Sequence, residues 1–253
     1  MKYYEKSKSI PELYCPEKTL SELANHYETD KGTADSKTLT WGYSHSGHFT
    51  WGYTEVYEKY MKHFRDTKDP VQFLEVGILD GRFPLASPKV WLSYFKNLNL
   101  YCIDNFWGAP PNDDIAAEIC SLGVNFFYAD QGSEEHWNEI QKQISQPLDF
   151  IVEDGSHWPN HMLYTLWRSI PLMRSGGFYF MEDLQHETTQ GVYGYNNHDL
   201  YHSMLKFKST GVFESQILSY DICKDIESAF TVTDIHLGGP SHNITVLCAL
   251  QKK

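Results

Sequence analysis

The sequence predicts an α/β fold in which a mostly parallel sheet carries helices on both faces. From residue 71 onward, short and nearly continuous apolar segments alternate with segments of helical character. Strands that are buried on both faces have this continuous apolar pattern, whereas strands with one solvated face alternate apolar and polar residues. Acidic side chains also recur where the expected strands end, and parallel sheets bind their ligands at that edge.

Seven strands are expected, five of them in the alternating region. They lie at 71–77, 100–104, 124–130, 148–154 and 176–183, followed by two late strands near 228–236 and 243–250. The segment between the late strands contains Gly-Gly-Pro, so these two strands are expected to form an antiparallel hairpin.

Helices are expected between the strands because helix-start signals occur there. Ser87 precedes Pro88, Ser133 precedes two acids, and Pro159 follows a polar turn. Each of these is a typical beginning of a helix. The expected helices of this region lie at 87–96, 115–121, 133–144 and 159–173.

Residues 1–70 are more polar and aromatic than the rest and are expected to form an N-terminal helical or lid segment, with the main domain at 71–253. Helices are expected near 19–27 and 53–64. The loop between them contains TWGY twice, at 40–43 and 50–53. Two copies are too few for a repeat architecture, so a surface lid or a segment that covers a ligand is the better interpretation.

Composition excludes several classes of protein. The 253 residues are 41% hydrophobic, which suits a domain with a full core, and the formal charge of -12 argues against nucleic acid and anionic membranes as partners. The start of the chain has no apolar signal segment, and no apolar run approaches the roughly 20 residues of a membrane span. The five cysteines are scattered, so neither a disulfide framework nor a zinc knuckle is expected. A cytoplasmic protein is the resulting expectation.

The residues at the ends of the first three expected strands predict a site for a nucleoside. The first turn contains Gly77 and Gly81 but matches neither GxGxxG nor a phosphate-binding loop, so a pyrophosphate is poorly supported. Asp104, at the end of the second strand, suits two ribose hydroxyls. Asp130 and Gln131, after the third strand, could hold the amino group of an adenine. S-adenosylmethionine (SAM) is a nucleoside without phosphates and fits this set.

The fourth and fifth strand ends predict a divalent metal site. Asp154, Glu182 and Asp183 would lie on neighbouring strand ends, and three carboxylates suit Mg²⁺ or Mn²⁺. His157 follows in the same loop and could act as a general base. The alternative is structural, with Asp154 capping the following helix and the other two acids solvated.

A zinc site is a second alternative, because His157 and His161 have HxxxH spacing. Pro159 between them and the absence of a Glu after the first His weaken it.

Several of these segments resemble metal-dependent sugar O-methyltransferases of the macrocin and mycinamicin type. The resemblance covers roughly residues 25–185. It lies in the acidic segments DFIVEDGSHWPNH and GGFYFMEDL, in the N-terminal segments ETDKGT and GYTEVYEKYM, and in FLEVGILDG, SPKVWLSYF and LYCIDNF. The two acidic segments together are its most specific part.

The resemblance implies a class I SAM-methyltransferase (Rossmann-like) fold. It implies that Asp154, Glu182 and Asp183 are metal ligands and that His157 is the base. The SAM contacts that it implies are Glu75, Gly77, Asp104, Asp130 and Gln131. One departure from the family pattern lies after Gly77, where Arg82-Phe83-Pro84 replaces a Gly-Gly pair.

The expected function is SAM- and metal-dependent O-methylation of a sugar hydroxyl. A nucleotide-activated sugar, such as a heptose for a surface polysaccharide, is the first interpretation of the substrate, and a homo-oligomer is expected. One alternative is a natural-product-linked sugar or a catechol-like diol, although the polar segment 185–199 favours a sugar. Another is a non-catalytic SAM-fold binding protein, which titration with SAM would test. A nucleotide-sugar dehydrogenase is weaker, because the first turn lacks the phosphate fingerprint.

Overall fold

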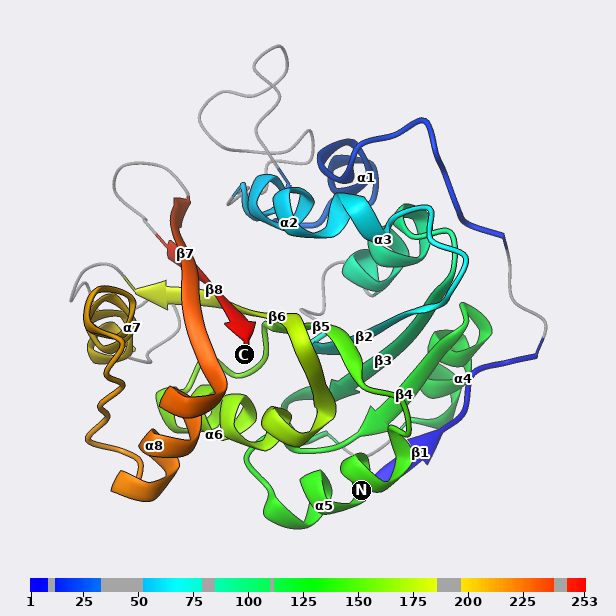
Figure 1. Cartoon of the computed structure of the whole chain (residues 1–253). Helices are drawn as coiled ribbons and strands as arrows, with labels where there is room; N and C mark the ends of the chain where they lie inside the picture. The colour runs from blue at the N-terminus through cyan, green and yellow to red at the C-terminus, as the bar shows by residue number, and fades with distance from the viewer. Residues whose placement is uncertain (9–11, 33–51, 79–84, 110–111, 186–196, 239–244) are drawn as a thin grey trace. The chain divides into compact units, whose positions relative to one another are not determined.

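The computed structural model describes residues 1–8, 12–32, 52–78, 85–109, 112–185, 197–238 and 245–253 (Figure 1). The chain divides into two compact units. Unit 1 comprises Met1–Asp130 and Gly238–Asn243, and unit 2 comprises Gln131–Leu237 and Ile244–Lys253. Each unit is built around its own set of hydrogen-bonded strands. The proposed N-terminal segment 1–70 falls within unit 1.

In the described segments of unit 1, four strands lie in the order β1-β4-β3-β2. Their bounds are Lys2–Tyr4 for β1, Val71–Val76 for β2, Leu98–Asp104 for β3 and Val124–Tyr128 for β4. β2 and β4 both pair in parallel with β3. The expected strands at 71–77, 100–104 and 124–130 are therefore confirmed to within two residues.

The prediction of seven strands is wrong by one, because the described residues contain eight. The additional strand is β1, which pairs antiparallel with β4. Its Tyr3 ring stacks on Phe127 with centroids 4.9 Å apart, and its Tyr4 ring stacks on Phe126 at 5.9 Å. Three residues are too few to show a strand period, so only the pairing with β4 reveals this strand.

The described residues of unit 1 form six helical segments. They are α1 Leu20–His26, α2 Tyr53–Met61, η1 Lys62–Phe64, α3 Ala86–Tyr94, η2 Phe106–Gly108 and α4 Asp113–Ser121. Thr19 and Glu22 form a capping box that begins α1, as the sequence pattern favours. Trp91 of α3 is fully buried against Phe73 of β2, with ring centroids 4.9 Å apart. The predicted lid loop, including the first TWGY copy, lies outside the described residues.

Unit 2 contains four strands in the order β5-β6-β8-β7. They are β5 Leu148–Glu153, β6 Met173–Gln185, β7 Phe230–Gly238 and β8 Thr245–Lys252. β5 and β6 run parallel, whereas β6 and β8 run antiparallel. The two late strands are neighbours, as expected for a hairpin, and the segment 239–244 that joins them lies outside the described residues.

Five helical segments lie in the part of unit 2 that the structure describes. They are α5 Glu134–Gln143, α6 Pro159–Ser169, η3 Ile170–Leu172, α7 His198–Thr210 and α8 Tyr220–Ala229. α7 and α8 are additions to the predicted elements. α8 had a readable signal, because Ser219 caps its first turn and Cys223, Ile226 and Ala229 form a buried stripe. α7 follows a polar segment, and its sequence begins without a side-chain cap.

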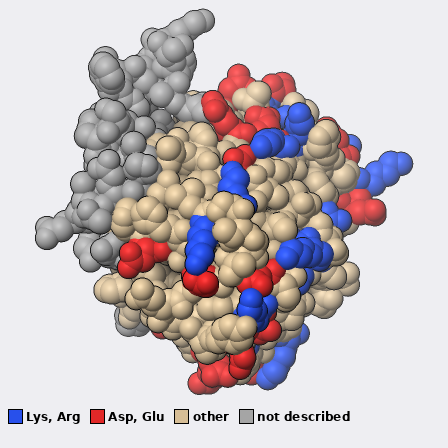
Figure 2. Space-filling model, turned by 60° about the vertical axis from the view of Figure 1, so that its left-hand side comes forward, with Lys and Arg blue, Asp and Glu red and all other residues tan. Residues whose placement is uncertain are grey.

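Three further observations concern the cysteines, the length of the helices and the surface charge. All five cysteines lie among the described residues, and each is a free thiol in the structure. Within the described part of the chain, no helix combines the length and apolar character needed to cross a bilayer. On the face shown in Figure 2, the described Lys and Arg side chains lie among Asp and Glu side chains and form no continuous basic patch.

Candidate functional site

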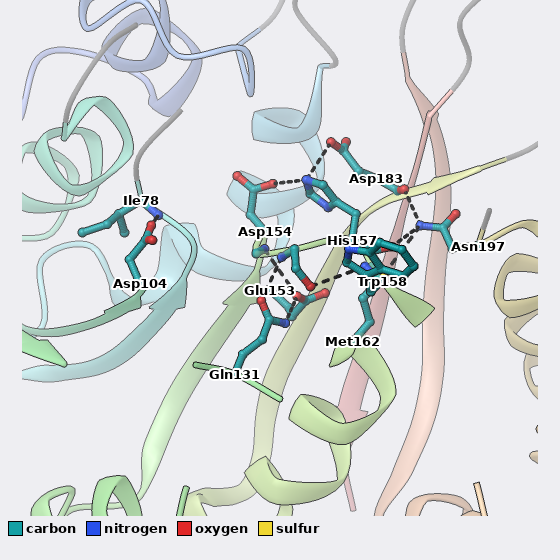
Figure 3. A network of polar contacts seen from close by, with 12 residues as sticks. Ile78, Asp104, Gln131, Glu153, Asp154, His157, Trp158, Met162, Asp183 and Asn197 are labelled. Carbon is teal, nitrogen blue, oxygen red and sulfur yellow. Dashed lines mark hydrogen bonds and ion pairs between the residues drawn. The ribbon is translucent and has the colours of Figure 1, made fainter. Parts of the chain in front are cut away.

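Two carboxylates and an imidazole converge in unit 2, where β5 ends and β6 approaches its end (Figure 3). Each of Asp154, His157 and Asp183 offers a ligand atom, and these atoms lie within 4.8 Å of one another. His157 Nε2 is 3.9 Å from Asp154 Oδ1 and 3.7 Å from Asp183 Oδ2. Both separations exceed a direct hydrogen bond. The three side chains therefore surround a common point, an arrangement that can hold one cation.

Two of these three residues have a strained backbone. His157 has φ 56° and Asp183 has φ 57°, in the left-handed region that non-glycine residues rarely adopt. Asp183 lies where the β6–β8 register shifts, between Met181 and Leu184. A bulge of this kind re-aims a side chain, and strained residues that persist at a site must be held by their surroundings.

Glu182, the third predicted metal ligand, has a different environment. Its side chain is buried, whereas those of Asp154 and Asp183 are about one fifth accessible. The convergent group consists of Asp154, His157 and Asp183 and does not include Glu182. The structure thus brings together two of the three predicted ligands with the predicted base, and a metal role for Glu182 stays a prediction.

The turn that carries Asp154 and His157 is shaped by a buried amide–carboxyl pair. Gln131 Nε2 donates to Glu153 Oε1 at 2.9 Å, and Gly155 N donates to the same oxygen at 3.3 Å. Gln131 Oε1 accepts from Ser156 N at 2.8 Å. A Cβ at position 155 would lie 1.9 Å from Gln131 Oε1, so only glycine permits this approach.

Gln131 and His161 therefore have structural partners. The Gln131 amide also donates to Thr165 Oγ1 at 3.3 Å, so both ends of its side chain are engaged within unit 2. Its predicted contact with SAM stays a prediction. His161 Nδ1 lies 2.9 Å from Ser156 Oγ, and His161 is outside the convergent group, which leaves the HxxxH zinc interpretation without support.

Glu153 is a buried carboxyl beneath this turn. Its side chain is fully inaccessible, and burial raises its pKa from 4.5 to about 7, although the charge of His157 and the bond from Gln131 oppose the shift. Its Oε2 has no hydrogen-bond partner among the described residues, which suits a proton at that oxygen. Glu153 supports the turn through its bonds with Gln131 and with the backbone of Gly155.

In unit 1, the Asp104 carboxylate joins two strand ends. Its Oδ2 accepts from Ile78 N at 2.9 Å (Figure 3). Its Oδ1 accepts from Phe106 N at 2.6 Å. Gly77, which precedes Ile78, has φ 87° and donates its N–H to Ile103 O at 2.8 Å. The sequence-predicted residues Gly77 and Asp104 thus meet at the carboxyl ends of β2 and β3.

The other predicted SAM contacts differ in accessibility. Glu75 is fully buried within β2, and Asp130 is partly accessible just after β4. Burial, with Glu75 and Asp104 nearby, raises the pKa of the Cys102 thiol well above its usual value, so this cysteine is a neutral core residue. Gly81 and the Arg82-Phe83-Pro84 departure lie outside the described residues.

Sequence analysis missed one residue of this site, Asn197. It directly precedes α7 and its side chain is fully buried. Its amide contacts the backbone of both strained residues (Figure 3). The segment 185–199 reads as a polar loop, and only the tertiary contacts distinguish this asparagine from its neighbours.

Replacing Glu153 by Gln should change how stability depends on pH. Because the folded-state pKa of about 7 lies above 4.5, the folded protein keeps a proton that the unfolded chain releases. Wild-type stability should therefore fall by about 3 kcal/mol, relative to Glu153→Gln, as pH rises from about 4.5 to about 7. Urea unfolding in EDTA across this range measures it, with the exposed Glu118→Gln as control. Parallel curves for wild type and Glu153→Gln would contradict the prediction.

Comparisons with known proteins find relatives by sequence and by structure. No protein-family model matches the chain. L-olivosyl-oleandolide 3-O-methyltransferase of Streptomyces antibioticus is 30% identical over 167 residues, 65% of this chain and 36% of the relative. Mycinamicin VI 2''-O-methyltransferase of Micromonospora griseorubida is 27% identical over 169 residues, with the same coverage. The chain thus spans about a third of the length of the curated relatives that it matches.

Solved structures with a similar fold include two of the MycE methyltransferase. MycE methyltransferase in complex with Mg and S-adenosylhomocysteine (SAH) aligns with 97% of this chain and 54% of its own, with a TM-score of 0.61 and 19% identity. A second MycE structure, which also contains mycinamycin VI, gives the same score and identity. These likenesses confirm the predicted fold class and resemblance. The chain has the class I SAM-methyltransferase fold and, over 65% of its length, is similar in sequence to the macrocin and mycinamicin type of O-methyltransferase.

Proposed function

We propose that this protein is a SAM-dependent, divalent-metal-dependent O-methyltransferase that acts on a sugar hydroxyl. The observation that carries the proposal is the convergence of Asp154 and Asp183 on His157, with two of the three residues in a strained conformation. The names of the similar proteins, which are O-methyltransferases of glycosylated compounds, support the same chemistry. So do the Mg and SAH in the MycE structures.

The donor set suits a hard divalent cation. Asp154 and Asp183 would supply carboxylate oxygens to Mg²⁺ or Mn²⁺, with Glu182 as the predicted third ligand. When bound, such a cation lowers the pKa of a coordinated hydroxyl and orients it. The partial accessibility of the two aspartates leaves them open to a ligand from solvent.

His157 is the proposed general base. Its imidazole lies within 4 Å of both aspartates, and a hydroxyl held by the cation would be near Nε2. Nε2 would take the hydroxyl proton as the oxygen attacks the methyl group of SAM. Nothing in the chain needs to form a covalent bond with the substrate, and positioning supplies much of the rate.

Unit 1 supplies the proposed residues for the nucleoside of SAM. Asp104 holds the turn after β2 and would accept hydrogen bonds from the ribose hydroxyls, while Gly77 allows close approach of the backbone. Glu75, Gly81 and Asp130 complete the proposed set, with Gln131 of unit 2. SAM supplies the methyl group.

The names of the relatives favour one substrate class over another. One is a 3'-O-methyltransferase of a rhamnosyl tetracenomycin from Streptomyces olivaceus, 29% identical over 170 residues, and another bears the name of mycinamicin VI. A sugar already attached to a natural product therefore has more support than the nucleotide-activated heptose expected from the sequence. A homo-oligomer and a cytoplasmic location remain part of the proposal.

Methyl transfer to a panel of acceptors tests the function. The panel contains glycosylated polyketides, nucleotide sugars and catechols, and mass spectrometry detects a gain of one methyl group from SAM with and without EDTA. Transfer to glycosides that EDTA abolishes is expected. Transfer that EDTA does not affect would remove the metal from the proposal, and a protein that binds no SAM would favour the non-catalytic alternative.

Asp154→Asn and Asp183→Asn should each reduce Mn²⁺ binding and methyl transfer below detection, because each removes a charged ligand of the proposed site. SAH affinity should stay within about twofold of wild type, since neither residue belongs to the proposed SAM set. Titration calorimetry with Mn²⁺ and with SAH measures both affinities. The exposed Asp221→Asn, in α8, is the matched control, and equal Mn²⁺ affinity in all four proteins would refute the assignment.

Asp104→Asn should weaken SAH binding by about 1.5–3 kcal/mol, the usual contribution of hydrogen bonds to a charged group. Titration of the folded variant with SAH checks the value. Asp113→Asn, which removes an exposed acid of the same unit, should leave the affinity unchanged. An unchanged dissociation constant for Asp104→Asn would place the ribose elsewhere.

His157→Ala should lower kcat by about 10²–10⁴, the range for loss of a general base, with little change in KM for the acceptor. Mn²⁺ binding should persist, which separates a base from a metal ligand. The exposed His63→Ala is the control for a lost imidazole. A folded His157→Ala protein with near-normal kcat would make His186, which lies outside the described residues, the next candidate.

A further inference from the structure

Asn197 links three segments of unit 2 through its side chain. Its Nδ2 donates to Asp183 O at 3.0 Å and to His157 O at 3.4 Å, and it lies 3.6 Å from Met162 Sδ (Figure 3). Its Oδ1 accepts from Gln185 N at 2.7 Å, and its own backbone N–H donates to Gln185 Oε1 at 3.3 Å. One fully buried amide thus joins the turn after β5, the bulged end of β6 and the start of α7.

The two carbonyls that receive these bonds belong to the two strained residues. His157 and Asp183 have nearly the same left-handed φ, and each carbonyl needs a partner where water is excluded. A left-handed non-glycine residue costs on the order of 1–3 kcal/mol and persists only when its surroundings fix it. Asn197 contacts the backbone of both residues at once, so it couples the position of one to that of the other.

The chemistry of this position requires an amide. The backbone presents two acceptors, from residues 157 and 183, and one donor, from residue 185. Among side chains of this size, only Asn offers two N–H donors and one carbonyl acceptor. An aspartate at position 197 would keep an acceptor for Gln185 N. Its second oxygen, however, would face the carbonyl oxygens of residues 157 and 183 and could donate no hydrogen bond to them when ionised.

We infer that Asn197 is a positioning residue that fixes the proposed ligand Asp183, together with the proposed base His157, and that through Asp183 it sets the affinity of the site for a divalent cation. The inference deepens the proposed function and rests on it. Asn197 acts through the backbone of the two residues and does not contact the cation. Partners of metal ligands in other proteins typically contribute 10–100-fold in affinity.

Mn²⁺ binding to Asn197→Asp tests the inference, with free Mn²⁺ measured by electron paramagnetic resonance. The added negative charge by itself would strengthen binding of a cation. If Asn197 positions the ligand Asp183, affinity should instead fall about 10-fold or more. The opposite signs of the two effects separate positioning from simple electrostatics.

Asn125→Asp is the matched control. Asn125 is also buried, its Nδ2 donates to Leu100 O at 3.3 Å, and its Oδ1 accepts from Lys6 N at 3.3 Å, all within unit 1. Both substitutions are expected to lower the melting temperature in EDTA, because each removes a buried donor. Only Asn197→Asp should lose affinity for Mn²⁺. Equal affinity in wild type and Asn197→Asp would overturn the inference and leave the proposed function standing.

Nuclear magnetic resonance of the wild type keeps the test valid if Asn197→Asp does not fold. With asparagine labelled in its side-chain amide, Mg²⁺ should shift the Asn197 signal and leave that of Asn125 in place. No shift of the Asn197 signal in protein that binds Mg²⁺ would overturn the inference. Wild-type protein that binds neither Mg²⁺ nor Mn²⁺ would overturn the metal-dependent function, and this inference with it.

Discussion

The hydrogen bond from Gln131 Nε2 to Glu153 Oε1 is the constraint on which the candidate site depends. It is buried, and it fixes Gln131 so that its Oε1 receives Ser156 N. The turn that follows β5 must then pass close to the amide, which only Gly155 allows. Asp154 and His157 project from this turn, so the direction of both side chains follows from a contact made beneath them.

Several features of the candidate site in unit 2 are unfavourable for the stability of the fold. A carboxyl is buried, two non-glycine residues are left-handed, and the β6–β8 register is broken at the acid. Each feature lowers the free energy of unfolding, and such features concentrate at functional sites, where function opposes stability. The Asn197 amide and the Gln131–Glu153 pair offset part of this cost by satisfying the backbone groups that the strained turns expose.

The similar proteins provide evidence that is independent of the contacts in the site. They match 65% of the chain at 27–30% identity, and MycE shares the fold at 19% identity. Fold alone does not define an activity, because one architecture carries many chemistries. The convergent carboxylates and imidazole are the basis on which metal-assisted methyl transfer is proposed, and their chemistry can be tested on this chain directly.

The sequence alone determined seven of the eight described strands and the acids near their ends. The apolar runs at 71–76 and 148–153 and the acids Asp104 and Asp154 are local features, and strand and turn preferences act over a few residues. Only the tertiary structure decided which of these acids meet. Asp183 reaches His157 through a bulge set by pairing with β8, and Asn197 reaches both from 14 and 40 residues away. β1 likewise exists only because Lys2–Tyr4 pair with a strand more than 100 residues later. Such contacts depend on the folded positions of distant segments, which no local pattern encodes.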